Sequence, residues 1–150
     1  MSDLPDRFPR GWFVLGHQRD FPIGEKKTIY GFNRKIQVER LADSSINFDA
    51  GQGEVWPILE QNQMVMIWHD VEKGDPDFYP EKIDACYSDE WSDYGMASFF
   101  VKNNCRELID NMADKGHFGP VHQAPFEGFW NEAKDHTYTS ICPALVLEKR

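Results

Sequence analysis

Apolar residues in the first half of the chain fall in short runs or alternate with polar residues, a pattern typical of β-strands. Gly11–Gly16 is an apolar run between glycines, and Ile36–Leu41 alternates at period two, which predicts a half-exposed strand. Met64–Trp68 is the longest unbroken apolar run and predicts a buried strand. Asp43–Gly53 is rich in turn-forming residues and predicts a loop.

Beyond residue 70 the pattern is less regular. Gly74–Pro80 contains two prolines and predicts an irregular connector. Trp91–Val101 is rich in aromatic and β-branched residues and predicts a strand. Phe126–Trp130 and His136–Glu148 predict two more strands.

Between these strands the apolar spacing becomes helical. Asn103 or Asn104 can cap a helix, and the residues expected on its inner face follow at i, i+1, i+4 and i+5: Leu108, Ile109, Met112 and Ala113. The fold class predicted from this order of elements is α+β.

Length and charge limit the classes of function. At 150 residues, with 41% hydrophobic and 14% aromatic residues, the chain is a globular domain with material for a core. Its net charge of -9 argues against a nucleic-acid partner. Much of the acidity lies in Glu72–Asp93, which predicts a solvated acidic connection.

The cysteines and the N-terminus indicate a compartment. Cys86, Cys105 and Cys142 form no C-x-x-C or C-x-H pair, so reduced, cytosolic thiols are expected. The polar N-terminus predicts no signal peptide, and no apolar run is long enough for a membrane span. The expected location is the cytoplasm.

The candidate chemistry lies in Asn111–His122, which holds two imidazoles, a carboxylate and a carboxamide. Asn111, Asp114 and His117 are three residues apart and would share one face of a regular helix. His117 and His122 are five apart and converge only if the helix is broken, for which Gly119–Pro120 is the predicted place.

Spacing alone leaves two interpretations of this segment open. It predicts part of a metal site, or else an ordinary core or surface pair of histidines. In the second case Asp114 is an exposed helix carboxylate and Asn111 a polar residue of the last helical turn.

The pattern Asp114-x-x-His117-x-x-x-x-His122, preceded by Asn104–Asn111, resembles the mononuclear iron signature of Rieske-type non-haem iron oxygenases, catalytic α subunit. The closest branch is that of 3-ketosteroid 9α-hydroxylase oxygenases and cholesterol 7-desaturases. Three other stretches resemble the family: Pro9–Gly16, Met66–Asp70 and Ser88–Asp93.

The resemblance implies a fold and a division of the chain. Residues 1–70 would be a residual Rieske-like β region without cluster ligands, and residues 71–90 an acidic, proline-containing connector. Residues 91–150 would be the N-terminal part of a helix-grip catalytic domain that carries the iron-histidine motif.

The resemblance also implies roles for the motif. His117 and His122 would bind Fe(II), Asp114 would connect them to a neighbouring subunit's cluster, and Asn111 would lie beside the iron. The family's carboxylate ligand comes from a downstream helix that is expected to be absent. Four nearby residues are candidates to replace it: Glu127, Glu132, Asp135 and His136.

Two departures from the family limit the expected activity. The family holds its [2Fe-2S] cluster with C-x-H and C-x-x-H, and neither motif is present, so no cluster is expected; its loops are interpreted as deleted near Ile46–Asp49. The implied function is an oxygenase-derived oxidoreductase that hydroxylates or desaturates a steroid-like or aromatic substrate with O₂, with activity impaired or lost in a truncated chain.

Two other functions of the chain remain open, and the family resemblance implies a set of partners. The chain is alternatively a non-catalytic remnant that binds a hydrophobic ligand or full-length α subunits, or a gene product without a function. The first alternative uses a half-cup of aromatic side chains: Trp91, Tyr94, Phe99, Phe118, Phe126, Phe129 and Trp130. The partners implied by the family are a ferredoxin-type reductase, like α subunits in a trimer and a hydrophobic small molecule.

Overall fold

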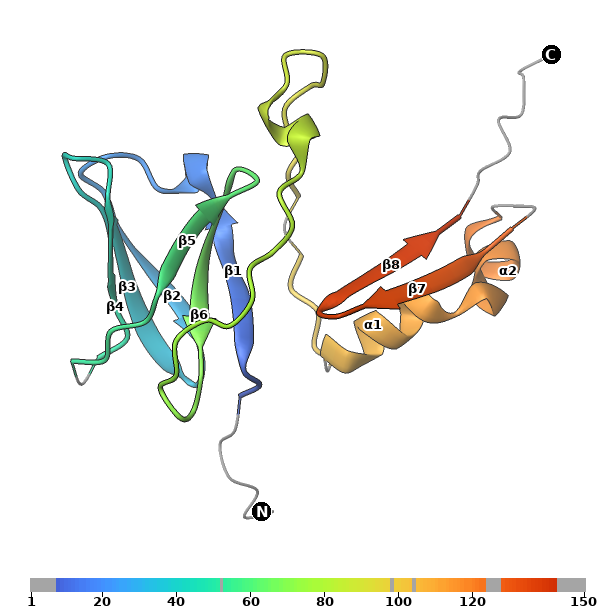
Figure 1. Ribbon diagram of the computed structural model, residues 1–150, viewed down its shortest axis with the longest axis horizontal. Coiled ribbons are helices and arrows are strands. Elements are labelled where there is room, and N and C mark those ends of the chain that lie inside the picture. Colours follow the sequence, from blue (N-terminus) through green and yellow to red (C-terminus); the bar gives the residue numbers. More distant parts are fainter. Residues whose placement is uncertain (1–7, 52, 98, 104, 124–127, 143–150) are drawn as a thin grey trace. The chain divides into compact units, whose positions relative to one another are not determined.

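A computed structural model describes residues 8–51, 53–97, 99–103, 105–123 and 128–142 of the chain (Figure 1). The chain falls into two compact units, Met1–Tyr94 and Gly95–Arg150. The division at residues 70 and 90 that the resemblance implies concerns ancestry and stays a prediction.

The first unit contains two three-stranded antiparallel sheets (Figure 1). In spatial order, one sheet consists of β1 (Gly11–His17), β6 (Met64–His69) and β5 (Ile58–Gln61). The other consists of β2 (Lys26–Gly31), β3 (Arg34–Arg40) and β4 (Ile46–Asp49). Two 3₁₀ turns, η1 (Gln18–Asp20) and η2 (Asp84–Tyr87), lie outside the sheets.

The core of this unit takes side chains from both sheets. Ile36 and Val38 of β3 and Val65 of β6 are fully buried and pack with Phe21. Ile36 and Val38 are two residues apart, so both point to the same face of their sheet. The strands predicted at Gly11–Gly16, Ile36–Leu41 and Met64–Trp68 are therefore confirmed.

Two predictions for this part of the chain are wrong. The expected loop Asp43–Gly53 contains β4, in which Ile46 and Phe48 alternate with polar residues and pack against the core. Trp91–Val101 forms no strand among its described residues, and Phe99 is 85% exposed there. Its aromatic content therefore marks an exposed apolar segment and not a buried strand.

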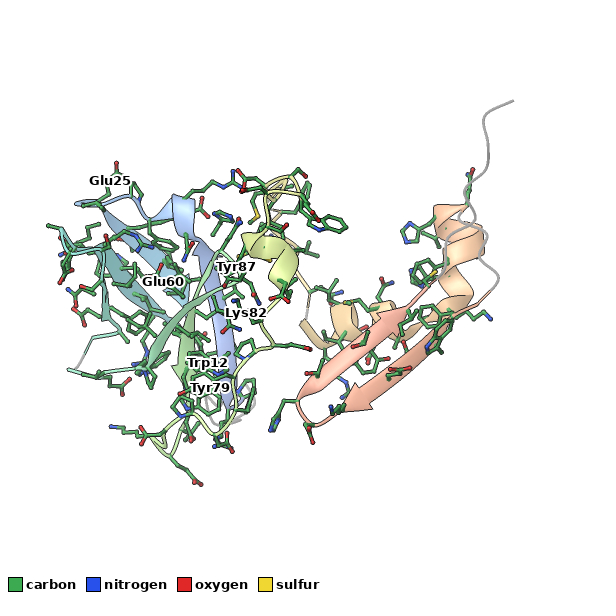
Figure 2. The ribbon with its side chains drawn as sticks, turned by 45° about the horizontal axis from the view of Figure 1, so that its top comes forward. Trp12, Glu25, Glu60, Tyr79, Lys82 and Tyr87 are labelled. Carbon is green, nitrogen blue, oxygen red and sulfur yellow. The ribbon has the colours of Figure 1, made fainter. Side chains whose placement is uncertain are left out.

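The segment after β6 is irregular, as Gly74–Pro80 predicts. Hydrogen bonds and a ring contact nevertheless attach it to the first unit. The Trp12 indole N–H donates to the Phe78 carbonyl at 2.8 Å, and its ring lies 5.5 Å from that of Tyr79 (Figure 2). Asn62, in the β5–β6 turn, donates from its side chain to the Glu81 carbonyl at 2.9 Å and from its backbone to the Tyr87 hydroxyl at 2.7 Å. The acidic connector is thus held by its backbone carbonyls and by two tyrosine side chains, while its acidic residues are exposed.

The second unit begins with helix α1 (Cys105–Ala113), which confirms the predicted helix. A 3₁₀ turn, η3 (Lys115–His117), and a short helix, α2 (Phe118–His122), follow. The hairpin β7 (Trp130–Lys134) and β8 (Thr137–Ile141) completes the described part. The predicted strand His136–Glu148 overlaps β8, whereas Phe126–Trp130 overlaps β7 only at Trp130, so the first strand of the hairpin lies later in the chain than predicted. Residues 126–127 and 143–148 of these predictions lie outside the described residues.

The apolar face of α1 differs from its prediction. Leu108, Ile109 and Met112, expected to face inward, are 65%, 57% and 49% exposed. None of the described residues from 95 to 142 is buried. The helical spacing was interpreted correctly, but the described residues of this unit leave the apolar face of the helix largely exposed.

The antiparallel sheets and few helices agree with the predicted α+β class, and the helix-grip detail stays a prediction. Cys86 and Cys142 are free thiols. Among the described residues, no helix has both the length and the apolar character needed to cross a membrane.

Candidate metal centre

The motif segment is built from three short pieces. α1 ends at Ala113, and the Asp114 N–H makes one of its last bonds, 3.1 Å to the Asp110 carbonyl. Asp114 then adopts an extended conformation, with φ -82° and ψ 101°. The prediction that Asn111, Asp114 and His117 share one regular helix face is therefore wrong.

The helix ends here because Asp114 uses its side chain to cap the next turn. Its Oδ1 accepts the Gly116 N–H at 2.8 Å, which begins η3. A Cβ on Gly116 would lie only 3.2 Å from the same oxygen, so the missing side chain allows this close approach. This role of Gly116 was not predicted from the sequence, although an aspartate two residues before a glycine is a known turn signal.

The predicted helix break at Gly119–Pro120 is also wrong. Both residues lie inside α2, which runs from Phe118 to His122 and ends at Gln123 in the left-handed region, φ 51°. Pro120 is the third residue of this helix, where its missing N–H has no intrahelical acceptor to lose. A proline in a first helical turn is tolerated, so the change of direction occurs earlier, at Asp114.

The structure brings the two motif histidines together. The ring centroids of His117 and His122 lie 5.1 Å apart at 71°. Imidazole nitrogens that share a metal ion each lie about 2.1 Å from it, which places their rings at a comparable separation. The convergence predicted for this pair is thus present, with a different backbone path.

His117 is the more enclosed of the two. Its side chain is 13% exposed, and its buried Nδ1 makes no hydrogen bond within the described part of the chain. The nearest carboxylate atom is Asp114 Oδ2, 3.5 Å from Nδ1. Asp114 therefore caps η3 with one oxygen and faces His117 with the other, as a carboxylate that orients a metal-binding imidazole does.

The remaining candidates do not complete a site among the described residues. No group of three or more His, Cys, Asp or Glu side chains there is placed to hold a metal ion. Glu132 lies on β7, and Asp135 and His136 form the exposed β7–β8 turn. Glu127 lies outside the described residues, and Asn111 has an exposed side chain on α1.

Aromatic rings adjoin the pair. Phe118 lies 4.6 Å from the ring of His117 and 5.8 Å from that of Phe129, centroid to centroid. Of the other proposed cup residues, Trp130 begins β7 and Phe99 is exposed. Trp91 and Tyr94 belong to the first unit, and Phe126 lies outside the described residues.

Comparison with known proteins gives relatives that match most of this chain but only about half of their own length. A 3-ketosteroid-9-alpha-monooxygenase oxygenase component of Rhodococcus rhodochrous is 28% identical over 98% of this chain and 50% of the relative. The chain spans about half the length of the curated oxygenase components that it matches. The alignment covers 196 positions, more than the chain's 150 residues, so the relative has residues without a counterpart here.

One further relative matches part of the sequence, and one solved structure matches the fold. Cholesterol 7-desaturase of Hemicentrotus pulcherrimus is 34% identical over 53% of this chain and 17% of its own. The crystal structure of dicamba monooxygenase bound to dicamba matches with a TM-score of 0.67 at 14% identity, over 87% of this chain and 55% of that one. This last match concerns the fold alone.

The family model described as 3-Ketosteroid 9alpha-hydroxylase C-terminal domain matches residues 67–144, just over half of the chain. The matched range includes Asp114, His117 and His122. The resemblance to the steroid branch of the Rieske-type oxygenases is confirmed, and the chain belongs to the 3-ketosteroid 9α-hydroxylase C-terminal domain family.

Proposed function

We propose that this chain is an oxygenase-derived protein that binds one Fe(II) through His117 and His122. The observation that carries this proposal is the convergence of the two rings, 5.1 Å apart, on a motif within the matched family range. The contact of His117 Nδ1 with the Asp114 carboxylate, at 3.5 Å, supports it, because a carboxylate beside one ring nitrogen leaves Nε2 for a metal ion.

The chain's own residues would have distinct roles. His117 and His122 donate imidazole nitrogens, and Asp114 holds the His117 ring in its orientation. Phe118 and Phe129 exclude water from one side of the pair. Fe(II) bound by two histidines and a carboxylate supplies the open positions at which dioxygen and a substrate meet.

We propose further that this chain alone does not turn over as an oxygenase. It has no C-x-H or C-x-x-H for a [2Fe-2S] cluster. The relative also has residues within the aligned range that lack a counterpart in this chain, which supports an internal loss. Its described residues also hold no third metal-binding side chain beside the histidines. Iron binding and hydroxylation are therefore separate properties here, and the first can be present without the second.

An anaerobic metal titration tests the iron site. The chain described here should bind about one Fe(II) per molecule, and His117→Ala and His122→Ala should each abolish stoichiometric binding. Asp114→Asn should keep the site but weaken it about 10- to 100-fold, because it removes the orienting carboxylate. Asp110→Asn, a matched exposed carboxylate one turn earlier, should leave the affinity unchanged.

The result that contradicts this proposal is equal iron binding by wild type and both histidine variants, or none by wild type. His136→Ala tests whether a third histidine binds the metal. A loss of affinity in that variant identifies the hairpin histidine as a third ligand, whereas no change leaves the pair alone as the site.

One observation favours a second candidate function, the binding of a partner or an apolar ligand without catalysis. The apolar side chains of α1 are about half exposed or more, and no described residue of their unit is buried. Covering this face with a steroid-like molecule or a full-length α subunit would stabilise the unit. A monodisperse monomer with no thermal shift on adding cholesterol or the α subunit would exclude this function.

A further inference from the structure

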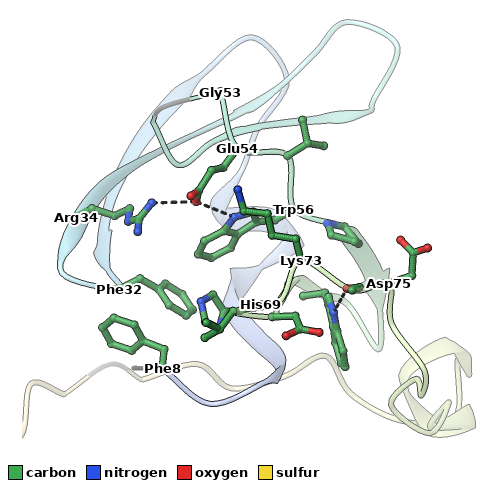
Figure 3. A pocket seen from close by; sticks show the side chains of 15 residues that line it. Phe8, Phe32, Arg34, Gly53, Glu54, Trp56, His69, Lys73 and Asp75 are labelled. Atoms are coloured by element: carbon green, nitrogen blue, oxygen red, sulfur yellow. Dashed lines mark hydrogen bonds and ion pairs between the residues drawn. The ribbon is translucent and has the colours of Figure 1, made fainter. Parts of the chain in front are cut away.

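A cavity of about 650 Å³ opens at one end of the first unit, away from the iron-site segment in the sequence (Figure 3). Its wall is formed by the end of β6 and by four connections: the residues before β1, the β2–β3 turn, the β4–β5 connection and the turn after β6. The volume lies within the range of about 300–1,000 Å³ typical of small-molecule sites. The proposed iron site uses none of these residues.

Aromatic rings form the inner wall of the cavity. The centroid of Phe32 lies 4.8 Å from Trp56 and 4.8 Å from His69, and Phe8 lies 5.0 Å from Phe32 (Figure 3). The His69 Nδ1–H donates to the Pro9 carbonyl at 3.0 Å, which leaves Nε2 as the ring's other hydrogen-bonding atom. Such a wall suits a flat, unsaturated ring.

The backbone holds Phe32 in an unfavourable conformation to make this wall. Phe32 and Asn33 have φ values of 52° and 55°, in a two-residue turn between the paired residues Gly31 and Arg34. Glycine and asparagine favour this region, whereas a bulky aromatic residue rarely adopts it. Such strain persists where the surroundings fix it and concentrates at binding sites.

The charges around the cavity leave one ammonium group without a partner. Arg34 is paired with Glu54 at 3.0 Å, and the same carboxylate oxygen accepts the Trp56 indole N–H at 3.2 Å. Asp70 is likewise paired with an arginine outside the wall. Lys73, in contrast, has no side-chain hydrogen bond or ion pair with any residue that the structure describes.

The position of Lys73 suits an anion. Its backbone lies in the left-handed region, φ 58°, at the end of the turn after β6, and its N–H donates to the Asp70 carbonyl at 3.1 Å. Lys73 lines the same cavity as the aromatic rings, and in the view of Figure 3 its side chain overlaps Trp56, whereas Asp75 points away from the rings. The unpaired positive charge therefore belongs to the lining of this cavity.

We propose that this cavity binds a small planar aromatic carboxylate, with its ring against Phe32 and Trp56 and its carboxylate beside the Lys73 ammonium. The apolar wall and the single unpaired cation each contribute one part of this specificity. The site belongs to the first unit and is independent of iron.

The test compares 2-naphthoate with 2-naphthalenemethanol, its neutral counterpart, on the full chain. Binding is followed by the indole N–H resonance of Trp56, assigned from Trp56→Phe, so that contacts elsewhere on the protein are not counted. Wild type should prefer the carboxylate roughly two- to fivefold, the range of an exposed ion pair. Lys73→Gln should remove that preference and leave the affinity for the alcohol unchanged.

Two variants on exposed positions keep the test independent of folding. Val55 is 91% exposed at the cavity wall, and Val55→Glu should weaken naphthoate binding more than alcohol binding by repelling the anion. Lys82→Gln, which removes a cation lying 4.7 Å from the Tyr87 ring outside the cavity, should retain the preference. No saturable shift of the Trp56 resonance, or an unchanged preference in Lys73→Gln, would overturn the proposal.

Discussion

The two units of this chain use similar local structure and differ in what covers their apolar side chains. Both contain antiparallel strands joined by two-residue turns. In the first unit, two sheets bury Phe21, Ile36 and Val65 against each other. In the second, one hairpin and two short helices leave Leu108 and Ile109 more than half exposed.

The difference shows that correct secondary structure is not sufficient for a stable unit. A single two-stranded hairpin is marginal in water, and so is an isolated helix of nine residues such as α1. The first unit draws its stability from apolar side chains removed from water between two sheets. Binding of iron, a ligand or a partner surface, as proposed above, would add stability to the second unit.

Hydrogen exchange of the intact chain should show the largest difference between the units. Amides of β6, paired on both sides by β1 and β5, should be protected at least about 1,000-fold, as expected for opening by global unfolding. Amides of α1 should exchange within about tenfold of unfolded rates. Mass spectrometry of peptides from each unit measures both, and equal protection would contradict the contrast drawn here.

The same substitution at two isoleucines tests the role of burial directly. Ile36→Ala should cost about 3 kcal/mol of unfolding free energy, because Ile36 is fully buried between the sheets. Ile109→Ala, at a position 57% exposed, should cost less than about 0.5 kcal/mol. Urea denaturation followed by tryptophan fluorescence measures both. A large effect of Ile109→Ala would instead reveal a covered helix, as in an oligomer.

Arginine pairs extend the comparison to polar contacts. The Arg40 side chain is 12% exposed and forms a fork with Glu60, at 3.1 and 2.7 Å, while its Nε donates to the Phe21 carbonyl at 2.7 Å. Arg40→Lys should cost about 1–2 kcal/mol, because an ammonium group cannot reproduce this planar set of donors.

The matched control for Arg40 lies in the second unit. Arg106 and Asp110 approach within 3.7 Å, with side chains 83% and 62% exposed. Arg106→Lys should change the unfolding free energy by less than about 0.5 kcal/mol. The same urea denaturation compares the two variants, and equal costs would mean that burial does not decide the strength of these pairs.

Sequence predicted the fold best where one pattern dominates locally. The continuous apolar run of β6 and the alternation in β3 identified their strands. β2 was not predicted because it is an exposed strand with two lysines, and its pairing with β3 is what makes it a strand. The Trp91–Val101 prediction failed for the opposite reason, since strand-forming residues there have no partner strand among those described.

For the candidate site, sequence identified the residues better than their geometry. Asp114, His117 and His122 were named, and the two histidines do converge. Their backbone path was wrong because Pro120 is equally compatible with breaking a helix and with occupying its first turn. The aromatic cavity could not be predicted, because its wall comes from the end of β6 and four separate connections that share no motif.

The smallest expected effect concerns the pH dependence of the first unit. The backbone N–H of Glu72, 2.9 Å from Asp70 Oδ1, lowers the pKa of the Asp70 carboxyl, and the Arg10 guanidinium, 3.1 Å from Oδ2, lowers it further. A lowered pKa in the folded state means that the ionised carboxylate stabilises the fold above its unfolded pKa of about 3.9. This stabilising contribution of the carboxylate should fall as the pH decreases below that value and through the folded pKa.

Asp70→Asn should therefore be less stable than wild type at pH 7 and equal to it near pH 2, in urea denaturations across that range. Asp110→Asn, on the exposed helix of the second unit, should match wild type throughout; a stability difference for Asp70→Asn that persists unchanged at pH 2 would assign its effect to packing instead of charge.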